Sequence, residues 1–587
     1  MHLNFDSLRS AYATGAHPAD IVDDVLARIA ARGDDHVWIR VLTRAEIEPY
    51  LRALEGRDPA TAPLYGLPFA IKDNIDLAGV PTTAACPAFA YTPARTATAV
   101  ARAIAAGAIP IGKTNLDQFA TGLVGVRSPY GRPVNPFDPT LIPGGSSSGS
   151  AVAVAAGLVS FAFGTDTAGS GRVPAALNNI VGLKPTCGLV STSGVVPACR
   201  SLDCVSVFAL SVDDAARVLA AVAGFDPADP FSRAAPPLAP PSPRAPRFGV
   251  PPLGQREWFG NAAAAPLFAA AIAHLHAVGG EAVEVDLTPL LDAGRLLYGG
   301  PWVAERYAAI RSFIDARPEA LHAVTRAVIL GGAAPSAADA FAASYRLREL
   351  TRALEPMWQR IDALLLPTLG ASHSVAAVEA DPLRLNAQLG HYTTFVNLLD
   401  LSGVAVPAGF QPDGRPWGVT LLAPAFHESV LLPIAARLHA ASGVRMGATG
   451  APLPAPIEAA TSDAARVELV VCGAHMSGLP LNHQLSDRGG RLARVTRTVA
   501  EYRLVALPDG RPGLERVAHG AAIAVEVWSL PVAQLGSFVA AIPPPLGIGT
   551  VRLDGGASAK GFLCESIAAA AATDISAYGG WRAWLAR

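Results

Sequence analysis

Two short segments of the chain are rich in serine and glycine and could carry nucleophilic chemistry. The first is Pro-Gly-Gly-Ser-Ser-Ser-Gly-Ser at residues 143–150, and the second is Gly-Thr-Asp-Thr-Ala-Gly-Ser-Gly-Arg at residues 164–172. They enclose an apolar run, residues 151–163, which is typical of a protein core and not of a flexible linker. Glycine lets the backbone approach a ligand closely, and a serine hydroxyl can be activated as a nucleophile. The pattern therefore predicts an active centre built around a serine.

A nucleophilic serine needs a base, and the sequence offers Lys72 where many serine hydrolases use histidine. No histidine occurs in residues 37–273, and no Gly-x-Ser-x-Gly motif surrounds Ser170, although a histidine distant in sequence remains an alternative. Lys72 directly follows the apolar stretch at residues 67–71. Burial there would lower the lysine pKa by several units from its usual value of about 10.4, and Ser146 could relay the proton.

The elements that must position these residues alternate between helical and extended patterns. A helical rhythm of apolar residues covers residues 6–32, and residues 98–106 form another predicted helix. Short apolar runs at residues 67–71, 109–112 and 363–368 predict buried strands. This alternation predicts an α/β domain with a largely covered sheet.

The chain has 587 residues, which is enough for more than one domain. Residues 447–465 are rich in Ala, Pro, Gly and Thr without periodicity, so they predict a linker. The linker would join a domain at residues 1–446 to a smaller α+β domain at residues 466–587. The proline-rich residues 234–246 are another possible boundary. Because the α/β pattern continues after them, we interpret them as a surface excursion of the first domain.

The composition argues against several classes of function. Hydrophobic residues make up 51% of the chain, charged residues 16%, and the formal net charge is -2, so no surface for nucleic acid or an anionic membrane is predicted. Polar residues interrupt every apolar run before the ~18 residues of a membrane span, and the first residues lack the pattern of a signal peptide. The six cysteines show no Cys-x-x-Cys spacing, which indicates free thiols in a cytoplasmic protein.

Three motifs taken together resemble the amidase signature family, whose catalytic triad is Ser–cis-Ser–Lys. They are the Lys72 segment, the Gly-Gly-Ser-Ser segment and Gly-Thr-Asp-x-x-Gly-Ser-x-Arg, and the similarity extends over roughly residues 5–445. The resemblance implies an α/β fold with a central mixed sheet covered by helices. It also implies Ser170 as the nucleophile, Ser146 as the bridging serine after a cis peptide bond, and Lys72 as the base.

The same resemblance implies an oxyanion hole formed by the backbone N–H groups of Thr167, Ala168 and Gly169. This sequence departs from the family pattern at two positions. Ser148 and Ala168 stand where the family commonly has glycine, and each adds a Cβ where the backbone can require unusual torsions. These two departures bear on the oxyanion geometry and leave the three triad residues unchanged.

A narrower resemblance, to the allophanate hydrolases, concerns the substrate. Tyr298 and Arg306 are eight residues apart, about two helical turns, and could share one helix face. In the resembling family this tyrosine and arginine bind the substrate, helped by a glycine in an earlier turn, for which we select Gly122. Arginine suits a small carboxylate because it can donate two parallel hydrogen bonds. The implied reaction is hydrolysis of allophanate through a serine acyl-enzyme, giving ammonia and an N-carboxycarbamate that decarboxylates, without a metal or organic cofactor.

The second domain resembles the C-terminal domain of the longer allophanate hydrolases, which is similar to γ-glutamylcyclotransferase-like folds. In some relatives this domain is implicated in decarboxylating the first product, with an essential histidine. His483, in Leu-Asn-His-Gln-Leu, matches that histidine best, with Asn482 and Glu565 as further candidates. His475 is equally well explained as a structural histidine. The domain could instead serve packing and assembly alone.

The motifs also allow a second enzyme class. This alternative is a broad-specificity small-molecule amidase, or the glutaminase subunit of a tRNA-dependent amidotransferase, with a non-catalytic C-terminal module. The resemblance to allophanate hydrolases further implies a homodimer. It also implies a partner in metabolism that supplies the substrate, either a urea carboxylase or an enzyme of s-triazine breakdown.

Overall fold

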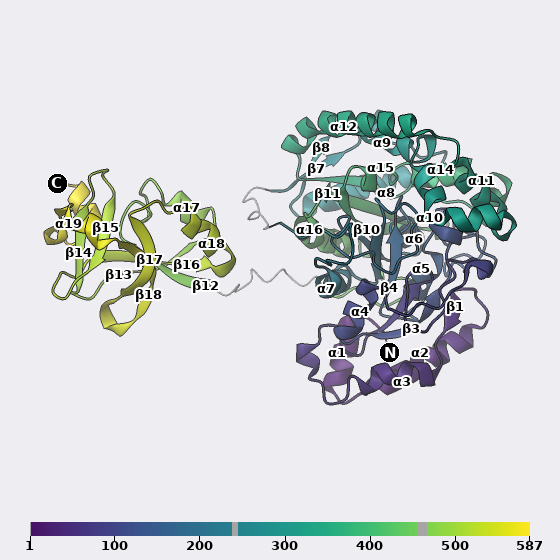
Figure 1. Ribbon diagram of the computed structural model, residues 1–587, viewed down its shortest axis with the longest axis horizontal. Helices are drawn as coiled ribbons and strands as arrows, with labels where there is room; N and C mark the ends of the chain where they lie inside the picture. The colour runs from purple at the N-terminus through teal and green to yellow at the C-terminus, as the bar shows by residue number, and fades with distance from the viewer. Residues whose placement is uncertain (1, 237–244, 456–465) are drawn as a thin grey trace. The chain divides into compact units, whose positions relative to one another are not determined.

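The structure, a computed structural model, describes residues 2–236, 245–455 and 466–587 (Figure 1). These residues form two compact units, one up to residue 455 and one from residue 466 onward. Most of the proline-rich stretch and the second half of the predicted linker lie outside the described residues. The first half of that linker belongs to the first unit, because Gly447 N donates to Asn179 O at 3.1 Å and Ala448 N donates to Ala155 O at 2.8 Å.

The first unit is organised around an eleven-stranded mixed sheet of described residues, in the order β1-β3-β2-β4-β6-β5-β10-β11-β9-β7-β8. The strands are β1 (Trp38–Val41), β2 (Pro68–Lys72), β3 (Ile109–Thr114), β4 (Phe161–Asp166), β5 (Val181–Lys184), β6 (Cys204–Ala209), β7 (Arg247–Val250), β8 (Glu281–Glu284), β9 (Ala363–Pro367), β10 (Leu401–Phe410) and β11 (Pro416–Pro424). Strand β2 pairs in parallel with β3 and β4, whereas β4 and β5 both pair antiparallel with β6. This is the central mixed sheet that the family resemblance implied.

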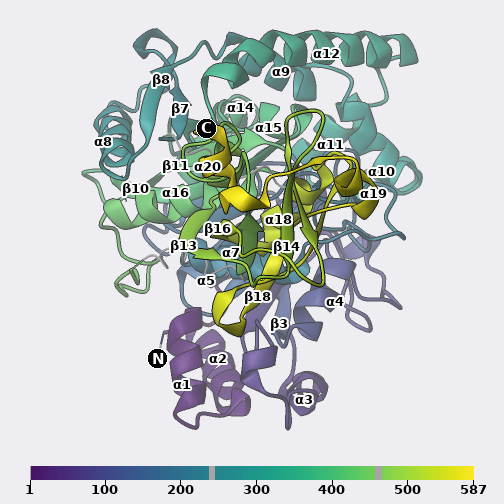
Figure 2. The ribbon, with the colours of Figure 1, turned by 90° about the vertical axis from the view of Figure 1, so that its left-hand side faces the viewer.

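Helices surround this sheet. They are α1 (Phe5–Ala13), α2 (Pro18–Arg32), α3 (Arg44–Arg52), α4 (Thr98–Ala105), α5 (Ser148–Ala155), α6 (Val173–Leu177), α7 (Val212–Val222), α8 (Ala264–Ala277), α9 (Thr288–Gly299), α10 (Val303–Ala316), α11 (Ala323–Gly331), α12 (Ala337–Arg360), α13 (Val375–Ala380), α14 (Arg384–Gly390), α15 (Phe395–Leu398) and α16 (Glu428–Ala441). Helices α9 and α12 run side by side at the top of both ribbon views (Figure 2). No helix in the described ranges is long and apolar enough to cross a membrane.

The strands that carry the serine and lysine motifs are buried on both faces. Every residue of β2, β3 and β4 is buried. Because successive side chains of a strand point to opposite faces, the sheet must be covered on both sides at this point. The apolar run 151–163 becomes the end of α5 and the start of β4. A Cβ on Gly149 would lie 2.3 Å from Val37 O, so glycine lets α5 pack directly against neighbouring backbone.

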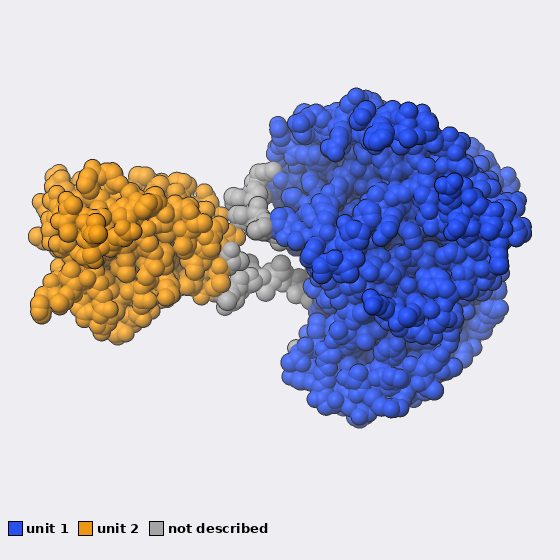
Figure 3. Space-filling model, in the orientation of Figure 1, with its two compact units in different colours: residues 1–238, 244–456 blue, residues 239–243, 457–587 orange. Residues whose placement is uncertain are grey.

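The second unit, orange in Figure 3, has its own core. It contains two sheets. A five-stranded sheet has the order β13-β16-β12-β18-β17, and a three-stranded sheet has the order β15-β14-β19. The elements are β12 (Arg466–Val471), β13 (Arg491–Arg497), β14 (Tyr502–Ala506), β15 (Pro512–Arg516), β16 (Ala524–Pro531), β17 (Leu546–Arg552), β18 (Ser558–Cys564), β19 (Thr573–Asp574), α17 (His483–Ser486), α18 (Val532–Ala540), α19 (Ser566–Ala570) and α20 (Trp581–Leu585). The unit is therefore an α+β fold, as the sequence predicted.

Candidate active site

Lys72 is the last residue of β2 and has no solvent-exposed surface. Its Nζ donates hydrogen bonds to Ser146 Oγ and to Thr165 Oγ1, both at 2.7 Å. Thr165 lies on β4, the parallel neighbour of β2, so sheet pairing fixes one of these contacts. The other contact joins residues 74 positions apart and brings the first serine motif to the lysine.

The surroundings of Lys72 favour its neutral form. In the part of the chain that the structure describes, no carboxylate oxygen lies within 4 Å of Nζ, so the ammonium would be buried without an ion pair. This burial lowers the pKa of Lys72 to about 7, although the more distant charges of Asp117, Asp203 and Asp166 partly oppose it. A lysine with that pKa is substantially neutral near pH 7 and can accept a proton.

Ser146 is held in a turn where two backbone segments pack against each other. The Gly145–Ser146 peptide bond is cis, as the family resemblance implied. A Cβ on Gly145 would lie 2.2 Å from Asp117 Oδ2 and 2.6 Å from Gly125 N, so only glycine fits there. Asp117 in turn accepts the N–H groups of Gly125 at 2.9 Å and Arg127 at 3.0 Å. The buried carboxylate thus ties the 124–127 loop to the serine turn.

Ser170 lies in the loop between β4 and α6 and is 3% exposed. Asp166 organises this loop by accepting the N–H groups of Gly169 at 2.9 Å and Gly171 at 3.0 Å. It also pairs with Arg172 through Nε at 2.9 Å and Nη2 at 3.0 Å. Burial acts to raise the pKa of Asp166, but the Arg172 guanidinium outweighs it and holds that pKa below its usual range. The charged, fully bonded carboxylate gives the serine loop a fixed shape.

The structure corrects one part of the predicted oxyanion hole. Gly169 has a single N–H, and it donates to Asp166 Oδ1, so it is not free for a substrate oxygen. For the N–H groups of Thr167 and Ala168, no acceptor is present among the described residues. The side chain of Thr167 is fixed by a hydrogen bond from Oγ1 to Asp203 Oδ1 at 2.5 Å. Two of the three predicted donors therefore remain free to stabilise an oxyanion.

Tyr298 and Arg306 meet, but not on one helix as predicted. Tyr298 is near the end of α9 and Arg306 lies in α10, because the chain leaves the helical path at residues 300–302, where Pro301 lacks an N–H. Arg306 Nη2 donates to Tyr298 OH at 3.2 Å, and the guanidinium carbon lies 5.3 Å from the tyrosine ring centre. Arg306 is 2% exposed and is close enough to Lys72 to help lower the lysine pKa.

Two threonines of this site were not predicted from the sequence. Arg306 Nη1 donates to Thr121 Oγ1 at 3.2 Å, and Lys72 donates to Thr165 as described above. Gly122 follows Thr121 with φ +153°, and a Cβ there would lie 2.7 Å from Asp117 Oδ2. Thr165 lies inside the second serine-rich segment and Thr121 directly precedes Gly122, but neither threonine carries a distinguishing signal of its own.

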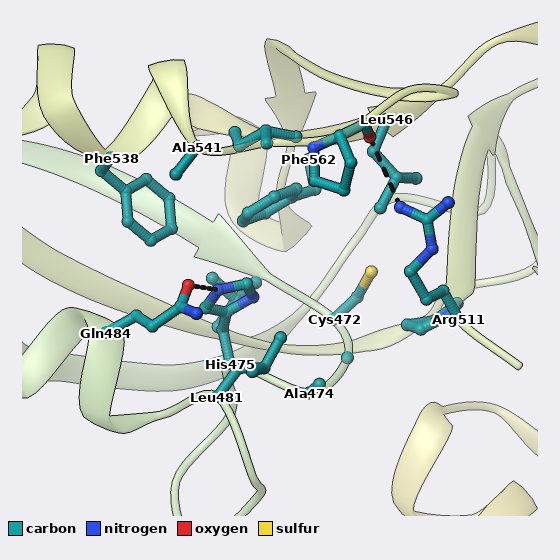
Figure 4. A pocket seen from close by; sticks show the side chains of 15 residues that line it. Cys472, Ala474, His475, Leu481, Gln484, Arg511, Phe538, Ala541, Leu546 and Phe562 are labelled. Atoms are coloured by element: carbon teal, nitrogen blue, oxygen red, sulfur yellow. Dashed lines mark hydrogen bonds between the residues drawn. The ribbon is translucent and has the colours of Figure 1, made fainter.

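A cavity of about 260 Å³ lies in the second unit (Figure 4). His475, on the loop after β12, stacks on Phe562 with ring centres 5.1 Å apart and meets the edge of Phe538 at 5.3 Å. Its Nε2 lies 3.0 Å from Gln484 Oε1, an acceptor, so this contact is a hydrogen bond in the tautomer that carries the proton on Nε2. Burial lowers the pKa of His475, and the neutral ring therefore keeps its Nδ1 lone pair at neutral pH.

His483, the histidine selected from the sequence, does not line this cavity. It is exposed on α17, and its Nδ1 lies 2.9 Å from Pro480 O. The sequence could not show which of the two histidines faces the cavity, because both belong to one motif. The fold shows that His475 does. In the described ranges, no group of three His, Cys, Asp or Glu side chains is arranged to hold a metal ion.

Comparisons with known proteins agree with this division into two units. The family described as Amidase matches residues 20–432, and the family described as Allophanate hydrolase C-terminal domain matches residues 467–586. The urea amidolyase of Saccharomyces cerevisiae is 42% identical over 574 residues, which are 94% of this chain and 31% of that protein. This chain spans about a third of the length of the curated urea amidolyases it matches. One component of the glutamyl-tRNA(Gln) amidotransferase of a Cyanothece species is 35% identical over 413 residues, covering 63% of this chain and 83% of that protein.

Among solved structures, the allophanate hydrolase of Kluyveromyces lactis superimposes with a TM-score of 0.78 at 38% identity, covering 98% of each chain. A mixed α/β fold with a buried lysine–serine pair next to a serine loop defines an amidohydrolase of the amidase class. The chain belongs to the amidase family and, with its second unit, to the allophanate hydrolases within it.

Proposed function

We propose that this chain hydrolyses allophanate, a urea that carries a carboxylate on one nitrogen. The observation that carries the proposal is the hydrogen bond between the buried Arg306 and the partly buried Tyr298, with the guanidinium close enough to Lys72 to lower the lysine pKa. Among the residues that the structure describes, no carboxylate oxygen lies within 4 Å of the Arg306 guanidinium. Such a buried guanidinium is suited to bind a substrate carboxylate, because a charged hydrogen bond is strong where water is excluded. The identity to urea amidolyases and to an allophanate hydrolase supports the same substrate.

In the proposed mechanism, neutral Lys72 takes the proton of Ser146, which takes the proton of Ser170 as that oxygen attacks the amide carbonyl. The N–H groups of Thr167 and Ala168 bind the developing oxyanion. The proton returns through the same relay to the leaving nitrogen, and ammonia departs. Water then attacks the acyl-enzyme through the same groups and releases an N-carboxycarbamate. That product loses one carbon dioxide to give carbamate, and carbamate breaks down to ammonia and a second carbon dioxide, so the net yield is two ammonia and two carbon dioxide.

We propose further that the second unit decarboxylates the first product, with His475 in place of His483. The neutral ring of His475 faces the cavity and is oriented by Gln484, which is the arrangement expected of a proton donor or acceptor. The cytoplasmic location, the homodimer and the urea carboxylase as supplier of the substrate remain predictions from the sequence.

Substitution of Arg306 by leucine tests the substrate. The KM for allophanate should rise about 10- to 100-fold, since a charged hydrogen bond contributes roughly 1.5–3 kcal/mol. Turnover of malonamide, an uncharged diamide of similar size, should change less than about threefold. Both are measured as ammonia release at about pH 8.5. This pH is above the pKa of Lys72, so a change in that pKa caused by the substitution does not alter the rates.

The matched control is Arg311→Leu, an exposed arginine on the same helix, which should leave both substrates unaffected. Equal losses on allophanate and malonamide in Arg306→Leu would show that Arg306 supports the fold and does not select the substrate. A wild-type enzyme that prefers malonamide would contradict the proposed function directly.

The second proposal is tested by the timing of ammonia release. With His475→Ala, the first ammonia should appear at the wild-type rate, and the second should lag because the N-carboxycarbamate must decarboxylate without help. His483→Ala should behave as the wild type. A lag in His483→Ala, with none in His475→Ala, would restore the histidine that the sequence favoured.

A further inference from the structure

Two cysteines of the first unit lie close together without being bonded. Cys187 Sγ and Cys204 Sγ are 3.5 Å apart. Cys204 begins β6 and is buried, whereas Cys187 follows β5 by three residues and is partly exposed. A disulfide requires sulfur atoms about 2.05 Å apart, so the two sulfur atoms would have to approach each other by about 1.5 Å. For the other four cysteines, no sulfur neighbour is present among the described residues.

A buried cation lies against this pair. Lys184, the last residue of β5, is fully buried, and its Nζ donates to Cys204 Sγ at 3.5 Å and to Pro185 O at 2.8 Å. Within the described residues, no carboxylate oxygen lies within 4 Å of this ammonium group. A buried ammonium without a counter-ion is costly, and a thiolate shared by the two cysteines would supply the missing negative charge.

The thiol groups share that charge unequally. The Cys204 thiol donates a hydrogen bond to Cys187 Sγ. This hydrogen bond and the positive charge of Lys184 lower the pKa of Cys187 to about 7, although burial acts to raise it. In contrast, burial raises the pKa of Cys199 and of Cys472 to about 12. The thiolate is the reactive form, so the partly exposed Cys187 is the nucleophile and Cys204 the neighbour that can resolve its oxidation product.

The pair is connected to the loop that carries Ser170. Cys204 is the register partner of Asp166 across β4 and β6. Asn397 Nδ2 donates to Asp166 O at 2.8 Å and reaches Cys204 Sγ at 3.8 Å. The residue before Cys204 is Asp203, which accepts the Thr167 hydroxyl. A displacement of Cys204 would therefore reach the serine loop at Asp166 and at Thr167.

We propose that Cys187 and Cys204 are a redox modification site, which hydroperoxides convert to a disulfide and whose closure lowers the amidase activity. The Cys187 sulfur attacks the peroxide, so that an S–O bond forms, the O–O bond breaks and an alcohol, or water from hydrogen peroxide, leaves. Cys204 then attacks that sulfur, an S–S bond forms, the S–O bond breaks and water leaves with the thiol proton. Two thiols lose two electrons to one peroxide. Disulfides of cytosolic proteins are commonly transient and regulatory in this way.

The full-length protein is treated with hydrogen peroxide, remaining thiols are blocked, and the digest is analysed for linked peptides. A Cys187–Cys204 link should form before any other cysteine is oxidised, and the Ser170-dependent amidase rate should fall about tenfold or more. Dithiothreitol should remove the link and restore the rate. Cys187→Ser should form no link and keep its rate in peroxide, while Cys564→Ser, the control, should respond as the wild type.

Three results would overturn the proposal. They are the absence of the link at peroxide concentrations that oxidise other cysteines, a link that forms without loss of rate, and an equal loss of rate in Cys187→Ser. The linked peptide is detected by mass and does not depend on which amide is the natural substrate, so this test is independent of the proposed function.

Discussion

Replacement of Ser170 by alanine is expected to reduce ammonia release from allophanate by a factor of about 10⁴ to 10⁶. The remaining Lys72–Ser146 pair can still move a proton, but no nucleophile is left to form the acyl-enzyme. The fold should persist, because the Asp166–Arg172 pair and the backbone bonds that shape the loop do not use the serine hydroxyl. Initial rates at saturating substrate, with the unfolding midpoint as a second measurement, check this result.

Ser148→Ala is the matched control for Ser170→Ala. Ser148 is buried in α5 two residues after Ser146, and its hydroxyl has no partner among the described residues. Its removal should leave the rate within about threefold of the wild type. If Ser170→Ala kept more than about a hundredth of the rate, the nucleophile would have to be another residue.

Lys72→Met is expected to lose activity by a factor of about 10³ or more and to make the protein more stable. Activity falls because methionine cannot accept the proton of Ser146. The free energy of unfolding rises because a buried ammonium with no ion pair is replaced by an apolar side chain. The net gain should be about 1–3 kcal/mol, less than the full desolvation cost, since Ser146 and Thr165 lose a hydrogen-bond donor.

The pH dependence of both effects follows from the lowered pKa of Lys72. Wild-type kcat/KM should fall as the pH drops below about 7, because the protonated lysine is not a base. The buried ammonium reduces the free energy of unfolding by its full amount below pH 7. Between pH 7 and 10.5 this reduction shrinks, because Lys72 is protonated in the unfolded chain but neutral in the folded protein. The advantage of Lys72→Met should therefore be largest at low pH and decline as the pH rises.

Lys113→Met provides the contrast for Lys72→Met. Lys113 is equally buried on the adjacent strand β3, but its Nζ lies 2.9 Å from Asp73 Oδ1. Removing it leaves a buried carboxylate unpaired, so the protein should be destabilised by about 3–5 kcal/mol. Denaturant unfolding of the three proteins measures the difference. If Lys72→Met were destabilised to the same degree as Lys113→Met, the ammonium of Lys72 would not be an unfavourable group in the folded protein.

Much of the candidate site could be predicted because its residues belong to local motifs. The strand that ends at Lys72 and the two serine segments each have a pattern within about ten residues, and the three motifs together resemble those of a family with a known triad. Local pattern also predicted the positions of β2, β3 and β9, since buried strands are continuous apolar runs. The interruption between Tyr298 and Arg306 was missed, although Gly300 and Pro301 mark it, because the eight-residue spacing was interpreted as uninterrupted helix.

Contacts between distant segments could not be predicted in the same way. Cys187 and Cys204 were interpreted as free thiols because their spacing fits no motif, and only the pairing of β5 with β6 brings them together. The choice between His475 and His483 depends on which side chain points inward, which a loop sequence does not encode by periodicity. The Gly169 N–H donates a hydrogen bond to Asp166, and this contact depends on the path of the loop.

Strands β2 and β4 lie in the interior of the eleven-stranded sheet and carry Lys72 and Thr165 on hydrogen-bonded neighbours. Backbone amides in such strands exchange with solvent only when the sheet itself opens, whereas terminal helices fray at little cost. The base and its hydroxyl partner therefore cannot separate by local fraying. Separation of Lys72 from Thr165 then requires the central sheet of the first unit to open.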